Sequence, residues 1–112
     1  MLNAAMRLRT TIRKVAIDLD LATKHVPADP LGWLLSATLA RKMNDLPRAQ
    51  RDIEEAAKRS PDDASVALEA GTIAVLSGRD DAARTAWEAA IALAPGSASA
   101  KSAAESLARL PK

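Results

Sequence analysis

Residues 61–97 read PDDASVALEAGTIAVLSGRDDAARTAWEAAIALAPGS and contain one full period of a 34-residue repeat. Pro61 begins this stretch, Pro95 lies one period after it, and Pro27 lies one period before it. A residue that favours helix N-caps follows each proline by two positions: Asp29, Asp63 and Ser97. The side-chain oxygens of Asp and Ser accept hydrogen bonds from the free N–H groups of a helix's first turn. The pattern therefore predicts that one helix ends at each proline and another begins two residues later.

A second break divides each period in half. Asn44 and Gly78 are also one period apart, and both residue types tolerate the left-handed conformation that closes a helix. Between the breaks, small and apolar residues recur every three or four positions, as at Ala83, Trp87 and Ala90, and no alternating β-branched run competes. The spacing predicts helices near residues 2–25, 30–43, 46–59, 64–77, 80–94 and 97–110.

The composition agrees with an all-α domain. The chain has 112 residues, a common size for a single domain. Alanine supplies 26 of its 54 apolar residues, and alanine both favours helix and lets helix backbones approach closely. With no Cys, Tyr or Phe and a single His, the chain lacks the residues of disulfide scaffolds, of thiolate nucleophiles and of most metal sites.

The 34-residue helix–turn–helix period resembles the tetratricopeptide repeat family. Two repeats match, over residues 30–63 and 64–97. The first offers the family's packing residues as Trp33, Ala37, Ala49, Ile53, Ala56 and Pro61. The second offers them as Gly71, Gly78, Ala83, Trp87, Ala90 and Pro95. The sequence departs from the family at Ala67, where Trp is expected, and at Ala40 and Ala74, where the family prefers Tyr.

This resemblance implies an α–α superhelix, or solenoid, of about six helices that forms one domain over residues 1–112. A long N-terminal helix within residues 1–27 would precede the two repeats, and a capping helix over residues 98–110 would follow them. Each helix pair is too small to bury its apolar face alone, so neighbouring repeats must stack.

The resemblance also implies a function, because the family binds extended peptides or helices in a concave groove lined by the first helix of each repeat. The groove positions would be Leu31, Leu34, Thr38, Arg41, Lys42, Ser65, Leu68, Thr72, Val75 and Leu76. Among them Leu34, Leu68 and Val75 would anchor the partner, and the basic Arg41 and Lys42 would select acidic flanking residues. The chain would thus be a non-catalytic protein-interaction module.

One subclass of the family clamps a C-terminal carboxylate with basic and amide side chains. The matching positions here are Leu34, Thr38, Glu69, Ser99 and Ala103. None of these residues fits that role, and Glu69 would repel a carboxylate.

Other functions lack support in the sequence. His25 has no neighbouring metal ligand, adjacent carboxylates such as Asp62 and Asp63 fit helix starts, and all four glycines are isolated. We therefore expect no enzyme, no cofactor and no metal. The net charge of +2 and the scarcity of aromatic residues argue against a nucleic-acid partner.

The lengths of the apolar runs and the residue composition give expectations about localisation and origin. The sequence has no apolar run long enough to span a membrane and no signal-peptide pattern, so we expect a cytoplasmic protein. The abundance of alanine and of Arg over Lys is typical of a GC-rich bacterial genome.

The N-terminal helix offers an alternative function. Its apolar stripe begins about a dozen residues before the next helix can cover it, which leaves Leu2, Leu8 and Ile12 exposed on an overhang. Exposed apolar stripes usually mark an interface, so the chain could be a structural unit that forms a homodimer through this helix. A third interpretation is an excised part of a larger tetratricopeptide protein, in which a missing repeat covers the stripe.

Overall fold

The computed structural model describes residues 29–111, which form five α-helices and no strand. The helices are α2 (Pro30–Lys42), α3 (Leu46–Arg59), α4 (Ala64–Leu76), α5 (Asp80–Leu93) and α6 (Ala98–Arg109). Each agrees with the range predicted from the sequence to within one residue at either end, so the all-helical prediction is confirmed. The helix predicted over residues 2–25 lies outside the described residues.

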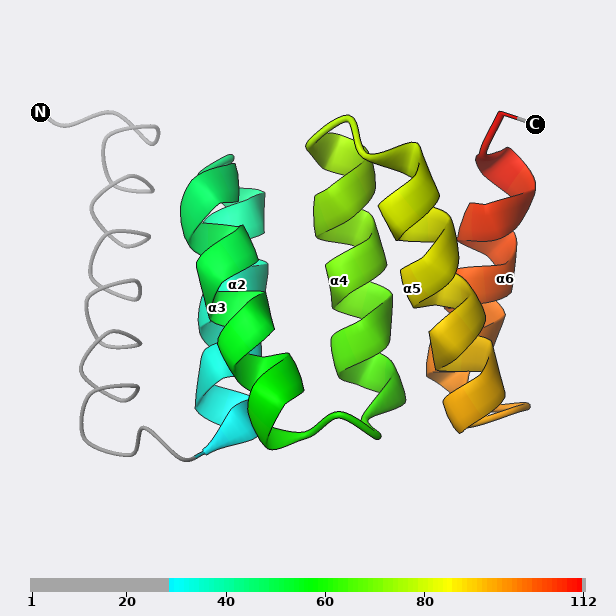
Figure 1. Cartoon of the computed structure of the whole chain (residues 1–112), viewed down its shortest axis with the longest axis horizontal. Coiled ribbons are helices and arrows are strands. Elements are labelled where there is room, and N and C mark those ends of the chain that lie inside the picture. Colours follow the sequence, from blue (N-terminus) through cyan, green and yellow to red (C-terminus); the bar gives the residue numbers. More distant parts are fainter. Residues whose placement is uncertain (1–28, 112) are drawn as a thin grey trace, which may run out of the picture.

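The helices stack in the order of the chain (Figure 1). Helix α2 packs against α3, α4 against α5, and α5 against α6, while α3 and α4 join the two pairs. Contacts of α4 with both α2 and α6 bring the first helices of the two repeats and the capping helix α6 into one layer. In Figure 1, α3 and α5 form the other layer and lie in front of α2 and α6. This two-layer stack is the solenoid that the repeat period predicts.

Side-chain caps begin the first helix of each repeat, as the sequence predicts. Asp29, Asp63 and Ser97 each accept a hydrogen bond from a backbone N–H in the first turn of α2, α4 and α6, with N···O distances of 2.9 to 3.0 Å. Such caps satisfy donors that have no partner within the helix.

The turn within each repeat depends on a left-handed residue. Asn44 has φ 61° and Gly78 has φ 78°, which confirms the conformation predicted for both positions. The residue that follows each of them, Asp45 or Arg79, precedes the first residue of α3 or α5. The carboxylate of Asp45 accepts from the N–H of Arg48 over 3.3 Å and caps α3, whereas Arg79 provides no side-chain cap.

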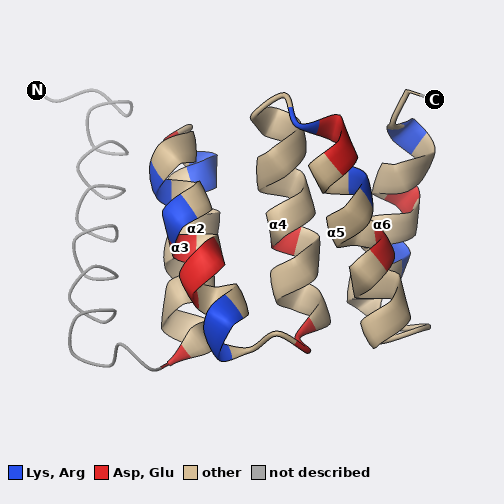
Figure 2. Cartoon of the chain, viewed as in Figure 1, with Lys and Arg blue, Asp and Glu red and all other residues tan. Residues whose placement is uncertain are grey.

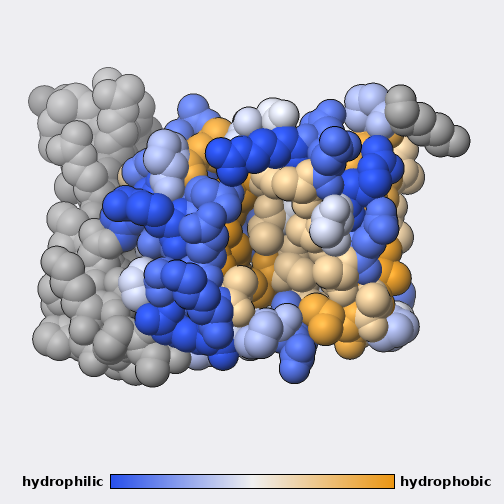
Figure 3. All heavy atoms as spheres, viewed as in Figure 1, coloured by the Kyte–Doolittle hydropathy of each residue, from blue (hydrophilic) through white to orange (hydrophobic). Residues whose placement is uncertain are grey.

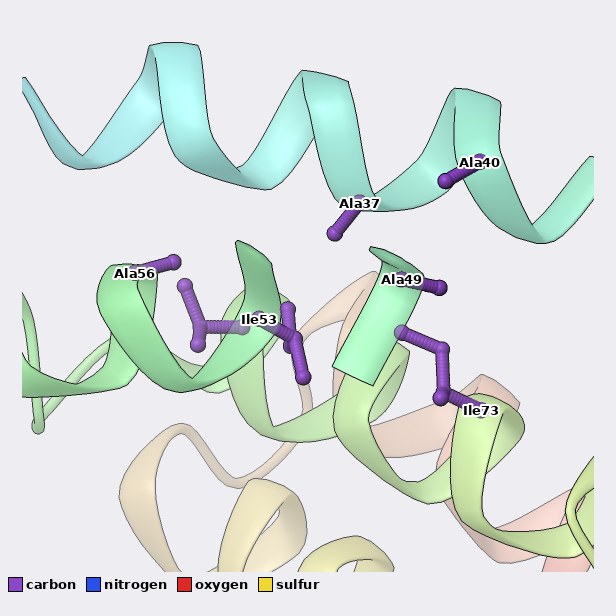
Figure 4. Close-up of a cluster of buried hydrophobic side chains, with 7 residues drawn as sticks. Ala37, Ala40, Ala49, Ile53, Ala56 and Ile73 are labelled. Carbon is purple, nitrogen blue, oxygen red and sulfur yellow. The ribbon is translucent and has the colours of Figure 1, made fainter. Parts of the chain in front are cut away.

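Two buried clusters form the core, one for each repeat. The first joins α2, α3 and α4 and contains Ala37, Ala40, Ala49, Ile53, Ala56, Val66 and Ile73 (Figure 4). The second joins α4, α5, α6 and the residue after α6, and contains Ala74, Ala83, Trp87, Ala90, Ala103 and Leu110. Alanine at most of these positions allows close approach of the helix backbones.

The alanine contacts make the helix interfaces sensitive to added volume. Ala83 of α5 is fully buried in the second cluster, whereas its neighbour Ala82 is exposed. We expect Ala83→Leu to lower the free energy of unfolding by about 1–3 kcal/mol, because a well-packed core must shift to admit extra carbons. The matched change Ala82→Leu is expected to alter it by less than about 0.5 kcal/mol. Urea denaturation followed by far-UV circular dichroism measures both, and equal effects would contradict the assigned register of α5.

The face formed by α3 and α5 differs in polarity along its length. Figure 3 shows hydrophilic residues gathered over α3 and mildly hydrophobic ones over the middle of α5. No helix within residues 29–111 is long and apolar enough to span a membrane.

Candidate functional site

The first helices of the two repeats, α2 and α4, line a groove together with the capping helix α6, on the side of the solenoid opposite to α3 and α5. The groove has a volume of about 390 Å³, and its walls come from α2, α4 and α6. Its lining residues are Leu34, Leu35, Thr38, Arg41, Ser65, Leu68, Glu69, Thr72, Ser102 and Ser106. The groove therefore combines a few large apolar side chains with hydroxyl groups and one pair of opposite charges.

The repeat period explains which residues line the groove. Leu34, Leu68 and Ser102 follow one another at intervals of one period, and so do Thr38, Thr72 and Ser106. Because α2, α4 and α6 lie in one layer, residues at equivalent positions face the same hollow. Leucine occupies the first of these rows in α2 and α4, and serine replaces it in α6. The groove is thus more apolar between α2 and α4 than beside α6.

Six of the ten groove positions predicted from the sequence lie together in this lining: Leu34, Thr38, Arg41, Ser65, Leu68 and Thr72. Leu31, Lys42 and Leu76 lie outside the lining and are exposed. Val75, predicted as an anchor, is half-buried and packs against the second core cluster, as Leu68 does, but unlike Leu68 it does not line the groove. Leu34 is also half-buried and packs against the first cluster. Leu2, Leu8 and Ile12, predicted to mediate self-association, lie outside the described residues, so the homodimer stays a prediction.

Leu35, Ser102 and Ser106 line the groove but were absent from the predicted set. The two serines had a usable signal, because they follow Leu68 and Thr72 by one period. Leu35 lies next to the predicted Leu34, and its 47% exposure shows that α2 presents a broader apolar surface than the repeat pattern predicts.

The two charged residues of the lining form an ion pair between the repeats. Nε of Arg41 in α2 donates to both carboxylate oxygens of Glu69 in α4, each at 3.0 Å. The Glu69 side chain is only 9% exposed, and that of Arg41 is 23% exposed. Glu69 is the only charged residue of α4. Figure 2 shows α4 uncharged over most of its length, with red near its middle and where the chain enters it. The pairing weakens the expected preference for acidic flanking residues, because Glu69 already compensates the charge of Arg41.

The hydroxyl groups of the lining differ in whether they already have a hydrogen-bond partner within the protein. Thr72 Oγ1 donates to the carbonyl oxygen of Leu68 at 3.2 Å, and Ser65 Oγ donates to Asp63 Oδ1 at 2.6 Å. Within residues 29–111, the hydroxyls of Thr38, Ser102 and Ser106 have no intramolecular hydrogen bond. These three groups can therefore bind the polar atoms of a ligand.

A second polar cluster joins α2 to α3 and was not predicted from the sequence. Ser36 Oγ donates to Asp52 Oδ2 at 2.6 Å, and Arg48 Nε donates to the same oxygen at 3.3 Å. Arg48 Nη2 also donates to Ser36 Oγ at 3.2 Å. Ser36 and Asp52 are buried, and the hydroxyl proton is held by a carboxylate that is paired with Arg48. This arrangement ties the two helices together and supplies no activated nucleophile.

The two tryptophans occupy packing positions. Trp87 is 3% exposed, and its Nε1 donates to the carbonyl oxygen of Leu68 at 3.2 Å. Trp33 packs against the first cluster, and the guanidinium of Arg59 lies 5.0 Å from the centre of its ring. Hydrogen bonds from Arg59 and then Lys58 lower the pKa of the partly exposed Glu55 carboxyl below its usual range. Neither tryptophan lines the groove.

Residues 29–111 contain no group of three or more His, Asp or Glu side chains arranged to hold a metal ion.

Comparison with known proteins identifies the repeat. The family model for the tetratricopeptide repeat matches residues 34–98, which is more than half of the chain and includes α3, α4 and α5 entirely. No match was found among curated proteins. The match and the two-layer stack of helix pairs agree with the repeat period, and the chain belongs to the tetratricopeptide repeat family.

Proposed function

We propose that this chain is a non-catalytic interaction module that binds a peptide segment of a partner protein in the groove between α2, α4 and α6. Tetratricopeptide repeats generally mediate protein–protein interactions. The observation that carries the proposal is the lining itself, in which Leu34 and Leu68 lie among five hydroxyl groups, and those of Thr38, Ser102 and Ser106 have no partner within the described residues. Apolar anchors with a few convergent polar groups are typical of a site that orients a bound segment.

The polar lining favours an extended peptide over a partner helix. A helix satisfies its backbone N–H and C=O groups internally, so its apolar face would offer no hydrogen-bond partner to the hydroxyls of Thr38, Ser102 and Ser106. An extended segment exposes both kinds of backbone group and can bond to these hydroxyls. The leucines would then contact alternate side chains of the segment.

A selection experiment tests the groove directly. The protein is immobilised and exposed to a phage-displayed library of random dodecapeptides, and an enriched peptide is synthesised for fluorescence anisotropy. We expect the double change Leu34→Ser and Leu68→Ser to weaken binding about 100-fold, because each lost leucine contact contributes about 1–2 kcal/mol.

The matched control replaces two leucines of the same helices outside the lining, by Leu31→Ser and Leu76→Ser. These side chains are 57% and 54% exposed, and we expect the control to keep the affinity of the unmodified chain. Far-UV circular dichroism verifies that both variants stay helical. Unchanged binding by the helical Leu34→Ser, Leu68→Ser protein would place the interaction site elsewhere.

A further inference from the structure

We infer that Glu69 determines the charge specificity of the groove. Because Glu69 forms an ion pair with Arg41, the groove binds an uncharged apolar segment and excludes segments with carboxylates. The inference rests on the proposed function, since it concerns the same groove. It departs from the repeat pattern, which places the basic Arg41 in the groove and so indicates a preference for acidic partners.

The charge inventory of the groove supports this specificity. Among the lining residues only Arg41 and Glu69 are charged, and they neutralise each other. The remaining lining is leucine, threonine and serine. A carboxylate that enters the groove therefore meets no uncompensated positive charge among these side chains.

An acidic segment could bind Arg41 only by displacing Glu69 or by lying beside it. Displacement would leave a carboxylate that is 9% exposed without its partner, and an unpaired buried charge is strongly unfavourable. Binding beside Glu69 would place two carboxylates against one guanidinium, with like charges in close contact. Both outcomes act against an acidic ligand.

An uncharged segment avoids both costs. The guanidinium group has five N–H donors, and the contact with Glu69 uses only the one on Nε. Within residues 29–111 the two Nη atoms of Arg41 have no hydrogen-bond partner. Held in place by Glu69, they can donate to backbone carbonyl oxygens of an extended peptide, which carry no net charge.

The change Glu69→Gln tests this role with little disturbance of the fold. Glutamine has the same shape, keeps a carbonyl oxygen that can accept from Arg41, and leaves no unpaired carboxylate in the groove. The change Glu88→Gln is the matched control, because it alters the net charge equally at an exposed position on α5, away from the groove. Thermal melts establish that both variants fold.

The same dodecapeptide library is selected on the unmodified chain and on each variant. We expect the unmodified chain and Glu88→Gln to enrich apolar peptides depleted in Asp and Glu, and Glu69→Gln to enrich acidic ones. Acidic peptides selected on Glu69→Gln should bind it about tenfold more tightly than they bind the unmodified chain.

The outcomes separate this inference from the proposed function. Acidic peptides enriched by the unmodified chain, or equal selection by Glu69→Gln and the unmodified chain, would overturn the role of Glu69. In that case, the proposed binding of peptides in the groove would still be supported if binding depended on Leu34 and Leu68. If the unmodified chain enriched no peptide above a blank surface, this result would contradict both peptide binding in the groove and the role of Glu69 in its specificity.

Discussion

Replacement of Trp87 by alanine is expected to lower the free energy of unfolding by about 3–5 kcal/mol, the usual cost of removing a buried aromatic side chain. The indole is the largest side chain of the second core cluster and is 3% exposed. It joins α5 to α4, where its Nε1 donates to the carbonyl oxygen of Leu68 at 3.2 Å. Its loss removes apolar contacts and a hydrogen bond at once. Urea denaturation followed by far-UV circular dichroism measures the change.

Trp33→Ala is the matched control for this experiment. Trp33 is only partly buried, and one face of its ring lies against the charged Arg59 at 5.0 Å. Because less apolar surface returns to water, we expect a smaller loss than for Trp87→Ala. A loss as large as that of Trp87→Ala would mean that the first cluster depends on its tryptophan as much as the second does.

The helices could be predicted from the sequence because their signals are local. The caps at Asp29, Asp63 and Ser97 and the left-handed turns at Asn44 and Gly78 each act within a few residues. The repeat period brings these signals back at equivalent positions, so each repeat supports the interpretation of the other. The same period indicated most of the groove, since it assigns equivalent positions to equivalent places in the stack.

The pairings within the site could not be predicted in the same way. Arg41 and Glu69 are 28 residues apart, and Ser36 and Asp52 are 16 apart. A repeat pattern assigns each residue to a face of its helix, but the choice of partner depends on side-chain length and on which helix faces it. The sequence pattern therefore predicts an unpaired positive charge at Arg41, whereas the structure pairs Arg41 with Glu69. Val75 shows the same limit, because Val75 and Leu68 both pack against the second cluster, but only Leu68 also lines the groove.

Gly71→Ala is expected to destabilise the protein by about 2 kcal/mol, although alanine is the better helix former. Gly71 lies inside α4, where its replacement by alanine would favour an isolated helix by about 1 kcal/mol. In the folded chain, a Cβ atom at this position would overlap Nε1 of the Trp87 indole ring. Such an overlap with a rigid, buried ring forces the two helices to move, and overpacking of this kind costs about 1–3 kcal/mol or more. The packing term therefore exceeds the gain in helix propensity.

The sign of this effect is expected to reverse when Trp87 is absent. In a Trp87→Ala background the indole no longer occupies the space next to Gly71, and the helix preference of alanine acts alone. We expect Gly71→Ala to stabilise that variant by about 0.5–1 kcal/mol, which a double-mutant cycle in urea measures. Two residues in direct contact must show such coupling, whereas distant residues have additive effects. Equal destabilisation by Gly71→Ala in both backgrounds would show that the glycine is required for a reason other than the approach of Trp87.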